Sequence, residues 1–145
     1  MTNFDNVSEM SRAYSPGEVE EKIYSFWDDT GKFQPAFISD KDPFVMIMPP
    51  PNVTGELHMG HALTFASEDM IVRWHRMQGD PTLFLAGTDH AGIATQVVVE
   101  RLLATEGVTR HDLGREEFEK RIWQWVDEYG ERIYDQLRRL GTSCD

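Results

Sequence analysis

Two histidines three residues apart, His58 and His61, are the side chains in this sequence best placed for chemistry. They follow a short apolar run over residues 44–48 and stand where a helical pattern begins. Side chains three apart project over the same helical turn, and the N–H groups at a helix start lie at the positive end of its dipole. This position suits a phosphate group whose negative charge grows during a displacement reaction.

Two other roles also fit the histidine pair. Polar side chains gather at helix starts, so simple capping is one alternative. Zinc binding with Asp89 or His90 is another, although no cysteine pair and no His-Glu-x-x-His pattern accompanies them. Gly60 favours the phosphate role, because a glycine inside a helix costs about 1 kcal/mol relative to alanine. A flat ligand lying against bare backbone would explain that choice.

The stretch before the histidines joins an expected strand to the helix through residues of restricted or polar character. Pro49, Pro50 and Pro51 hold the backbone extended, which either stiffens the loop or presents a rigid apolar wall to a ligand. Asn52 and Thr54 follow, and such side chains either bond the turn itself or point at a ligand. Residues 49–61 therefore predict a ligand loop.

A second polar loop follows the next apolar run, residues 82–86. Asp89 lies there, where its carboxylate could hold a cationic amine or cap the next helix. Residues 44–86 form a strand, helix, strand unit, and such units place their strands parallel. Both loops then leave the sheet at the edge where ligands bind in open parallel sheets. We expect the two loops to converge on one crevice.

Four helices are expected around these strands. Ser15 and Pro16 predict an N-cap and first residue, with Gly31 at the other end. A second helix would run to about residue 77 and bury a face that includes Leu63, Met70 and Trp74. A third begins near residue 93, with Ala94, Val97, Val98 and Leu102 inward, and a fourth spans 116–140 with its aromatic residues as a packing face.

The expected fold class is α/β: the first half of a Rossmann-like parallel-sheet nucleotide-binding domain over residues 43–145. A loose tail and short helical extension over residues 1–42 precede it. Two strands make only a marginal sheet, since doubly wound domains usually hold four to six. We therefore expect further chain to complete the sheet.

Composition limits the function classes. The chain has 145 residues and a formal net charge of −11, with 25 acidic and 14 basic side chains, so it is unsuited to gripping a nucleic-acid backbone by itself. One cysteine, Cys144, cannot form an internal disulfide and fits a reducing compartment. No apolar run approaches the length needed to cross a membrane. A cytoplasmic setting is expected.

With these residues in hand, the sequence resembles the class I aminoacyl-tRNA synthetases. Residues 58–61, His-Met-Gly-His, match that family's His-Ile-Gly-His signature with Met at its variable second place. The tetrapeptide is only moderately specific. The longer stretches, Pro-Pro-Pro-Asn-Val-Thr-Gly-Glu-Leu-His-Met-Gly-His over residues 49–61 and Gly-Thr-Asp-His-Ala-Gly-Ile-Ala-Thr-Gln over residues 87–96, are closer to the valyl-tRNA synthetases. The resemblance extends from about residue 14 to residue 145.

That resemblance implies activation of valine by ATP with Mg²⁺, giving valyl-adenylate for transfer to tRNA(Val). His58 and His61 would bind the ATP phosphates and stabilise the transition state, with Thr54 near the phosphates and Gly60 under the adenine. The amino-acid side would comprise Asp89 for the α-ammonium, Asn52 for positioning, and Pro49 and Pro50 as walls of the pocket. No tightly bound metal is implied.

Members of that family are several times longer than this chain. The editing domain, the Lys-Met-Ser-Lys-Ser loop and the tRNA-reading helices have no counterpart in it, so we expect the chain to be inactive alone and to meet tRNA only through other parts. Two alternatives stay open: a small nucleotidyltransferase sharing the His-x-Gly-His loop, and a non-catalytic interaction module built on the long fourth helix.

Overall fold

The computed structural model describes residues 13–36 and 40–145. The first twelve residues, most of the expected tail, lie outside the described part. The elements follow the expected order along the chain: α1 (Pro16–Asp29), β1 (Phe44–Ile47), α2 (Met59–Met77), β2 (Thr82–Leu85), α3 (Gly92–Thr105) and α4 (Arg110–Leu140). None of the helices in this part is long and apolar enough to cross a membrane.

The two strands pair in parallel, as predicted, with Phe44 opposite Thr82 and Ile47 opposite Leu85. Neighbouring residues along a strand point to opposite faces of the sheet. Met48 and Phe84 are buried in the core, whereas Val45 and Ile47 on the other face are 55% and 67% exposed. The described chain therefore covers one face of a sheet whose second face carries apolar side chains without a partner.

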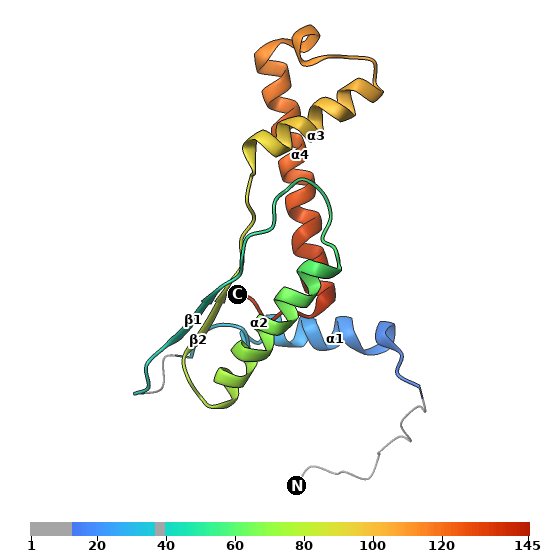
Figure 1. Ribbon diagram of the computed structural model, residues 1–145. Coiled ribbons are helices and arrows are strands. Elements are labelled where there is room, and N and C mark those ends of the chain that lie inside the picture. Colours follow the sequence, from blue (N-terminus) through green and yellow to red (C-terminus); the bar gives the residue numbers. More distant parts are fainter. Residues whose placement is uncertain (1–12, 37–39) are drawn as a thin grey trace.

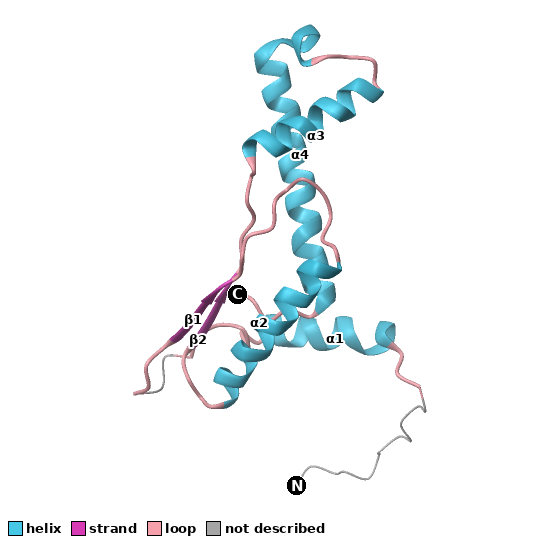
Figure 2. Ribbon diagram, in the orientation of Figure 1, coloured by secondary structure: helices cyan, strands magenta, loops and turns pink. Residues whose placement is uncertain are grey.

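Helix α4 runs along most of the length of the molecule, with α3 against its first half and α1 crossing near its C-terminal end (Figures 1 and 2). Val126, Ile133 and Leu137 are buried and join the sheet residues in one core, with Tyr129 packed against them. The predicted packing face is confirmed up to Leu137, whereas Leu140 at its end is exposed. The helix begins at Arg110, earlier than predicted, because Thr109 and Asp112 form a capping box. A break with non-helical backbone at Gly114 separates this first turn from the rest.

Helix α2 buries a different face from the one its pattern predicted. Phe65 and Val72 face the core, whereas Leu63 and Met77 are 71% and 84% exposed. The helix is apolar on two sides, and the described chain covers only one of them. The prediction of a single inward stripe through Leu63, Met70 and Trp74 was wrong for that reason.

The prediction for α3 was wrong by one residue. Thr95, Val99 and Leu103 are buried, and Val97 and Leu102 are exposed. At the other end of the chain, Pro16 does start α1, but the Ser15 side chain makes no capping hydrogen bond. The apolar pattern of a short segment predicts that a helix forms more reliably than it predicts which side of the helix faces the core.

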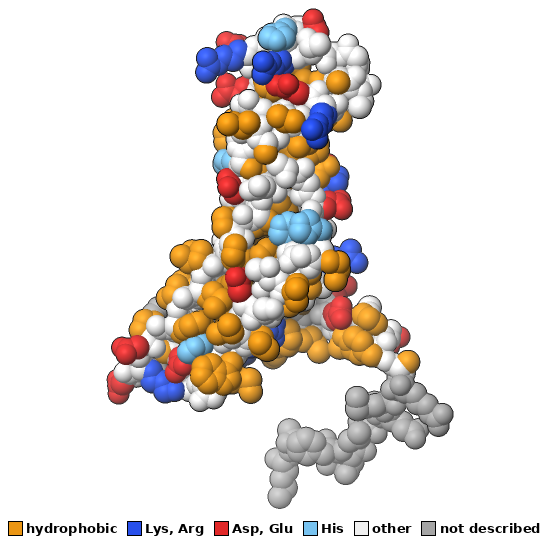
Figure 3. Space-filling view, in the orientation of Figure 1, with side chains coloured by type: hydrophobic (Ala, Val, Ile, Leu, Met, Phe, Trp, Pro, Cys, Tyr) orange, Lys and Arg blue, Asp and Glu red, His pale blue; other side chains and the backbone are white. Residues whose placement is uncertain are grey.

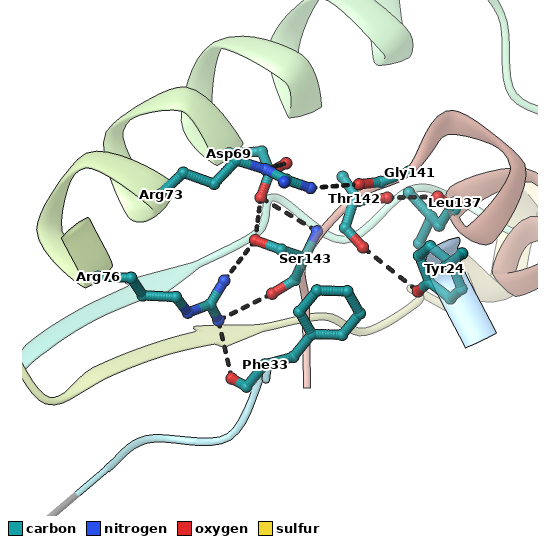
Figure 4. A network of polar contacts seen from close by, with 9 residues as sticks. All are labelled: Tyr24, Phe33, Asp69, Arg73, Arg76, Leu137, Gly141, Thr142 and Ser143. Atoms are coloured by element: carbon teal, nitrogen blue, oxygen red, sulfur yellow. Dashed lines mark hydrogen bonds and ion pairs between the residues drawn. The ribbon is translucent and has the colours of Figure 1, made fainter. Parts of the chain in front are cut away.

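A buried carboxylate joins α2 to the segment after α4 (Figure 4). Asp69 accepts hydrogen bonds from the backbone N and hydroxyl of Ser143, the first at 3.0 Å, and from Arg73 Nε at 2.7 Å. Arg73 also donates to the Gly141 carbonyl at 2.6 Å, and Arg76 donates to that of Ser143 at 2.8 Å. These bonds attach residues 141–143, which follow α4, to helix α2.

Candidate active site

The two polar loops do come together, as predicted. Asp89 N donates to the Pro51 carbonyl and Val53 N donates to the Asp89 carbonyl, both at 2.9 Å. Asn52 and Asp89 thus pair as an isolated parallel bridge beyond the end of the sheet. Figure 1 shows the two connections rising side by side from β1 and β2 before the first arches across to α2. The parallel pairing of the strands continues into both loops and holds Asn52 against Asp89.

The Asp89 carboxylate is exposed and held in one orientation. Its Oδ1 accepts from Ala91 N at 2.8 Å, and within residues 13–36 and 40–145 its Oδ2 has no hydrogen-bond partner. Asp89 does not cap α3, whose N-cap is Ala91 in the left-handed conformation without a side-chain bond. An oriented carboxylate with one unused oxygen can accept a cationic group.

His58 and His61 open α2 as a reciprocal cap. His58 Nδ1 accepts from Gly60 N at 3.1 Å, and His58 N donates to His61 Nδ1 at 3.2 Å. The two rings stack with centroids 3.9 Å apart and planes 25° apart. His58 is exposed and His61 half-buried, and histidine side chains lie at the surface near the start of α2 in Figure 3. The predicted capping role is therefore real, and it uses Nδ1 of each ring. It gives no role to Nε2 of either ring.

The cap settles which nitrogen of each ring carries the proton in the neutral form. A ring nitrogen that accepts from a backbone N–H cannot itself be protonated, so the hydrogen resides on Nε2 of both His58 and His61. Burial lowers the pKa of His61 below its ordinary value of 6.5, and His58 nearby lowers it further. In its neutral form the pair presents two Nε2–H donors next to a helix N-terminus, which is an anion-binding arrangement.

We expect the imidazole of His61 to titrate below pH 6.5, because protonation of Nδ1 would abolish its bond from His58 N. A pKa lowered by folding means that this stabilisation is present above the unfolded value and lost as pH falls through the folded value. NMR titration of histidine ring carbons in the expressed chain measures the midpoint. A midpoint at or above 6.5 would contradict the capping geometry.

Gly60 has a packing reason for lacking a side chain. A Cβ at this position would lie 3.0 Å from His58 Cε1 and 3.1 Å from His58 Nδ1, closer than nearly all real Cβ contacts. The sequence suggested bare backbone for a flat ligand, and the His58 ring supplies a second cause. A Cβ at position 60 would require the His58 ring to shift by a few tenths of an ångström.

The remaining predicted residues lie on the same loop. Pro49, Pro50 and Asn52 are exposed and follow β1 directly, and Thr54 is half-buried. Within the described residues, no three His, Cys, Asp or Glu side chains lie close enough together to hold a metal ion.

Two residues of α4 hold this loop, and sequence reasoning missed both. Trp125 Nε1 donates to the Val53 carbonyl at 2.7 Å, and Gln136 Oε1 accepts from Leu57 N at 2.8 Å. The sequence pattern predicts only that Trp125 packs with the other aromatic residues of this helix. Nothing in its spacing separates an indole that donates to a loop from one that only packs.

Comparison with known proteins assigns the family. Residues 22–145 match the model of tRNA synthetases class I (I, L, M and V). The chain belongs to this family. The alternatives of a small nucleotidyltransferase and of an interaction module are therefore set aside.

Similar class I synthetases include the "Valine--tRNA ligase" of Dehalococcoides mccartyi strain 195, 58% identical over 145 residues, which are 100% of this chain and 16% of that protein. "Valine--tRNA ligase, chloroplastic/mitochondrial 2" of Arabidopsis thaliana is 60% identical over 126 residues, 87% of this chain and 13% of that protein. The chain thus spans about a sixth of the length of the curated relatives it matches.

Among solved structures, the fold is similar to that of LeuRS from Agrobacterium radiobacter K84, determined as a ternary complex with tRNA and LeuAMS. The TM-score is 0.67 at 18% identity, over 91% of this chain and 15% of that one. This likeness shows a class I synthetase fold for the described elements. It confirms an α/β architecture with a parallel sheet.

Proposed function

We propose that this chain supplies the first half of the active site of a valine–tRNA ligase. In the reaction, a carboxylate oxygen of valine attacks the α-phosphorus of MgATP, the bond from that phosphorus to the bridging oxygen breaks, and pyrophosphate leaves. A hydroxyl of tRNA(Val) then attacks the carbonyl carbon of valyl-adenylate, and the acyl group passes to the tRNA as AMP leaves. The observation that carries the proposal is the pairing of Asn52 with Asp89, which sets two signature loops side by side.

The histidines would act on the phosphates. Both Nε2–H groups of His58 and His61 are unused by the cap, and hydrogen bonds to the phosphate oxygens would strengthen as charge develops there. Thr54, earlier on the loop, would contact the phosphates, and the adenine would lie over Gly60. Because the donors are fixed by backbone bonds before substrate binds, they would need little reorganisation.

Asp89 would hold the amino acid. The Oδ2 of its carboxylate is oriented by the Oδ1 bond to Ala91 and would accept from the valine α-ammonium. Asn52, directly beside it, would position the substrate, and the rigid surface of Pro49 and Pro50 would wall the apolar pocket.

The remainder of the active site would come from chain beyond this one. Residues 43–145 would form the first half of a Rossmann-like domain and residues 1–42 its extension. The apolar sheet face at Val45 and Ile47 and the outer face of α2 would receive the second half. Contact with tRNA would be made there too. A cytoplasmic location accords with the lone cysteine, Cys144.

A chimera tests the proposal. This chain replaces the matching 145 residues of the D. mccartyi enzyme, and exchange of labelled pyrophosphate into ATP is measured with valine. We call this protein the exchange chimera. We expect it to catalyse valine-dependent pyrophosphate exchange, and we expect none from the chain expressed alone. An inactive chimera that is folded by circular dichroism, or robust exchange by the chain alone, would contradict the proposal.

In the exchange chimera, Asp89→Asn should raise the KM for valine by about 10- to 100-fold, since a charge-assisted bond contributes about 1.5–3 kcal/mol. Asn can still accept from Ala91 N, so the loop turn is kept. Asp127→Asn, an exposed change on α4, is the control. An unchanged KM for valine with Asp89→Asn would remove Asp89 from the amino-acid site.

A further inference from the structure

Helix α4 contacts the candidate ligand loop at two points three turns apart. Trp125 Nε1 donates to the Val53 carbonyl at 2.7 Å, and Gln136 Oε1 accepts from Leu57 N at 2.8 Å. At 1.5 Å per residue these two side chains stand about 16 Å apart along the helix. The loop from Val53 to Leu57 is thereby spanned by one rigid element.

The bond from Trp125 satisfies the second backbone polar group of Val53. The Val53 side chain is fully buried, and its backbone N donates to the Asp89 carbonyl at 2.9 Å. Its carbonyl is taken by Trp125, whose ring stacks on Tyr129 at 3.9 Å. The Val53 peptide groups are therefore fixed from the Asp89 loop on one side and from α4 on the other.

The Gln136 bond acts at the residue immediately before His58. Leu57 N is a donor, so the amide oxygen of Gln136 must face it, which fixes the orientation of the amide. Leu57 and Gln136 are both partly buried, and an N–H left unpaired there would be costly. The backbone at Leu57, one residue before the His58 cap, is thus held in place by α4.

We propose that Gln136 and Trp125 are positioning residues for the proposed adenylation reaction. Gln136 acts through His58 on the phosphate donors, and Trp125 acts through Val53 on the Asn52–Asp89 pair. Neither touches substrate. This inference rests on the proposed function.

The test uses the exchange chimera with Gln136→Met, which keeps the length of the side chain and removes the acceptor. We expect kcat for valine-dependent exchange to fall about 10- to 100-fold, because small misplacements of catalytic groups have effects of that size. The KM for valine should change little, and the variant should remain folded at the assay temperature by circular dichroism. Gln124→Met, an exposed change of the same kind on α4, is the matched control and should leave exchange unaltered.

A double-mutant cycle separates positioning from general weakening of the fold. His58→Asn removes the Nε2–H donor but keeps a capping acceptor. If Gln136 acts through His58, Gln136→Met should have less than a threefold effect in the His58→Asn background. An equal loss in both backgrounds, or no loss in the parent chimera, would overturn the role of Gln136. Full activity of His58→Asn alone would instead contradict the proposed function of His58.

Trp125→Phe keeps an aromatic ring on Tyr129 and removes the donor to Val53. We expect the KM for valine to rise on the order of tenfold, as for the loss of one hydrogen bond, with kcat less affected. A KM increase that persists unchanged in the Asp89→Asn background would overturn this role, since Trp125 would then act independently of Asp89.

Discussion

Replacing both His58 and His61 by alanine in the exchange chimera is expected to lower valine-dependent exchange by on the order of 10³-fold, the largest effect on activity that the site predicts. Removing one preorganised donor from a charged transition state typically costs on the order of 10²- to 10³-fold, and residues that act as a unit are not additive. The single variants should therefore each approach the double variant.

The histidine cap requires a control that separates capping from catalysis. His58→Asn retains a capping side chain, so a pure capping role predicts near-normal exchange, whereas the phosphate role predicts a loss like that of alanine. His111→Ala, an exposed histidine near the start of α4, controls for the loss of an imidazole elsewhere. Rescue by asparagine would contradict the catalytic assignment.

The largest effect on stability is expected from Asp69→Ala. The buried carboxylate accepts from Ser143 and from Arg73, and its removal leaves the Ser143 N–H without its partner. The free energy of unfolding should fall by about 3 kcal/mol, as for breaking a buried, hydrogen-bonded charge. Urea unfolding of the expressed chain, followed by tryptophan fluorescence, measures the change.

Asp127→Ala is the matched control for Asp69, since Asp127 is exposed on α4. We expect its free energy of unfolding to stay within about 0.5 kcal/mol of the parent. Equal effects of the two substitutions would show that the Asp69 network does not hold the segment around Ser143.

The elements and the parallel pairing could be predicted from the sequence because they depend on local patterns. Short apolar runs bounded by proline and glycine predicted β1 and β2. A strand, helix, strand unit nearly always pairs its strands in parallel with a right-handed crossover. The same reasoning predicted that the two loops converge, since both follow the ends of neighbouring parallel strands, and the structure adds the pairing of Asn52 with Asp89.

The buried faces of α2 and α3 could not be predicted in the same way. Leu63 and Met70 are apolar, but nothing in the described chain covers them, and the core uses Phe65 and the charged Asp69 instead. Burial of Asp69 depends on Ser143, 74 positions along the chain. Periodicity within one helix carries no information about such a distant partner.

The two α4 residues that hydrogen-bond to the loop could not be predicted for a related reason. Trp125 and Gln136 fit an ordinary amphipathic helix, and their role appears only when Val53 and Leu57 are placed beside them. Side-chain bonds to loop backbone depend on the fold as a whole. The histidine pair, in contrast, is a local feature: residue type, spacing and the neighbouring glycine favour phosphate binding over the capping and zinc alternatives, and the phosphate role stays a prediction.

The structure of the exchange chimera with a non-hydrolysable valyl-adenylate analogue tests the central claim most directly. The account predicts the phosphate-mimicking group within about 3 Å of the Nε2 atoms of His58 and His61, and the valine ammonium within hydrogen-bond distance of Asp89. An analogue bound away from the two loops, or with its ammonium held by other groups while Asp89 faces solvent, would contradict it.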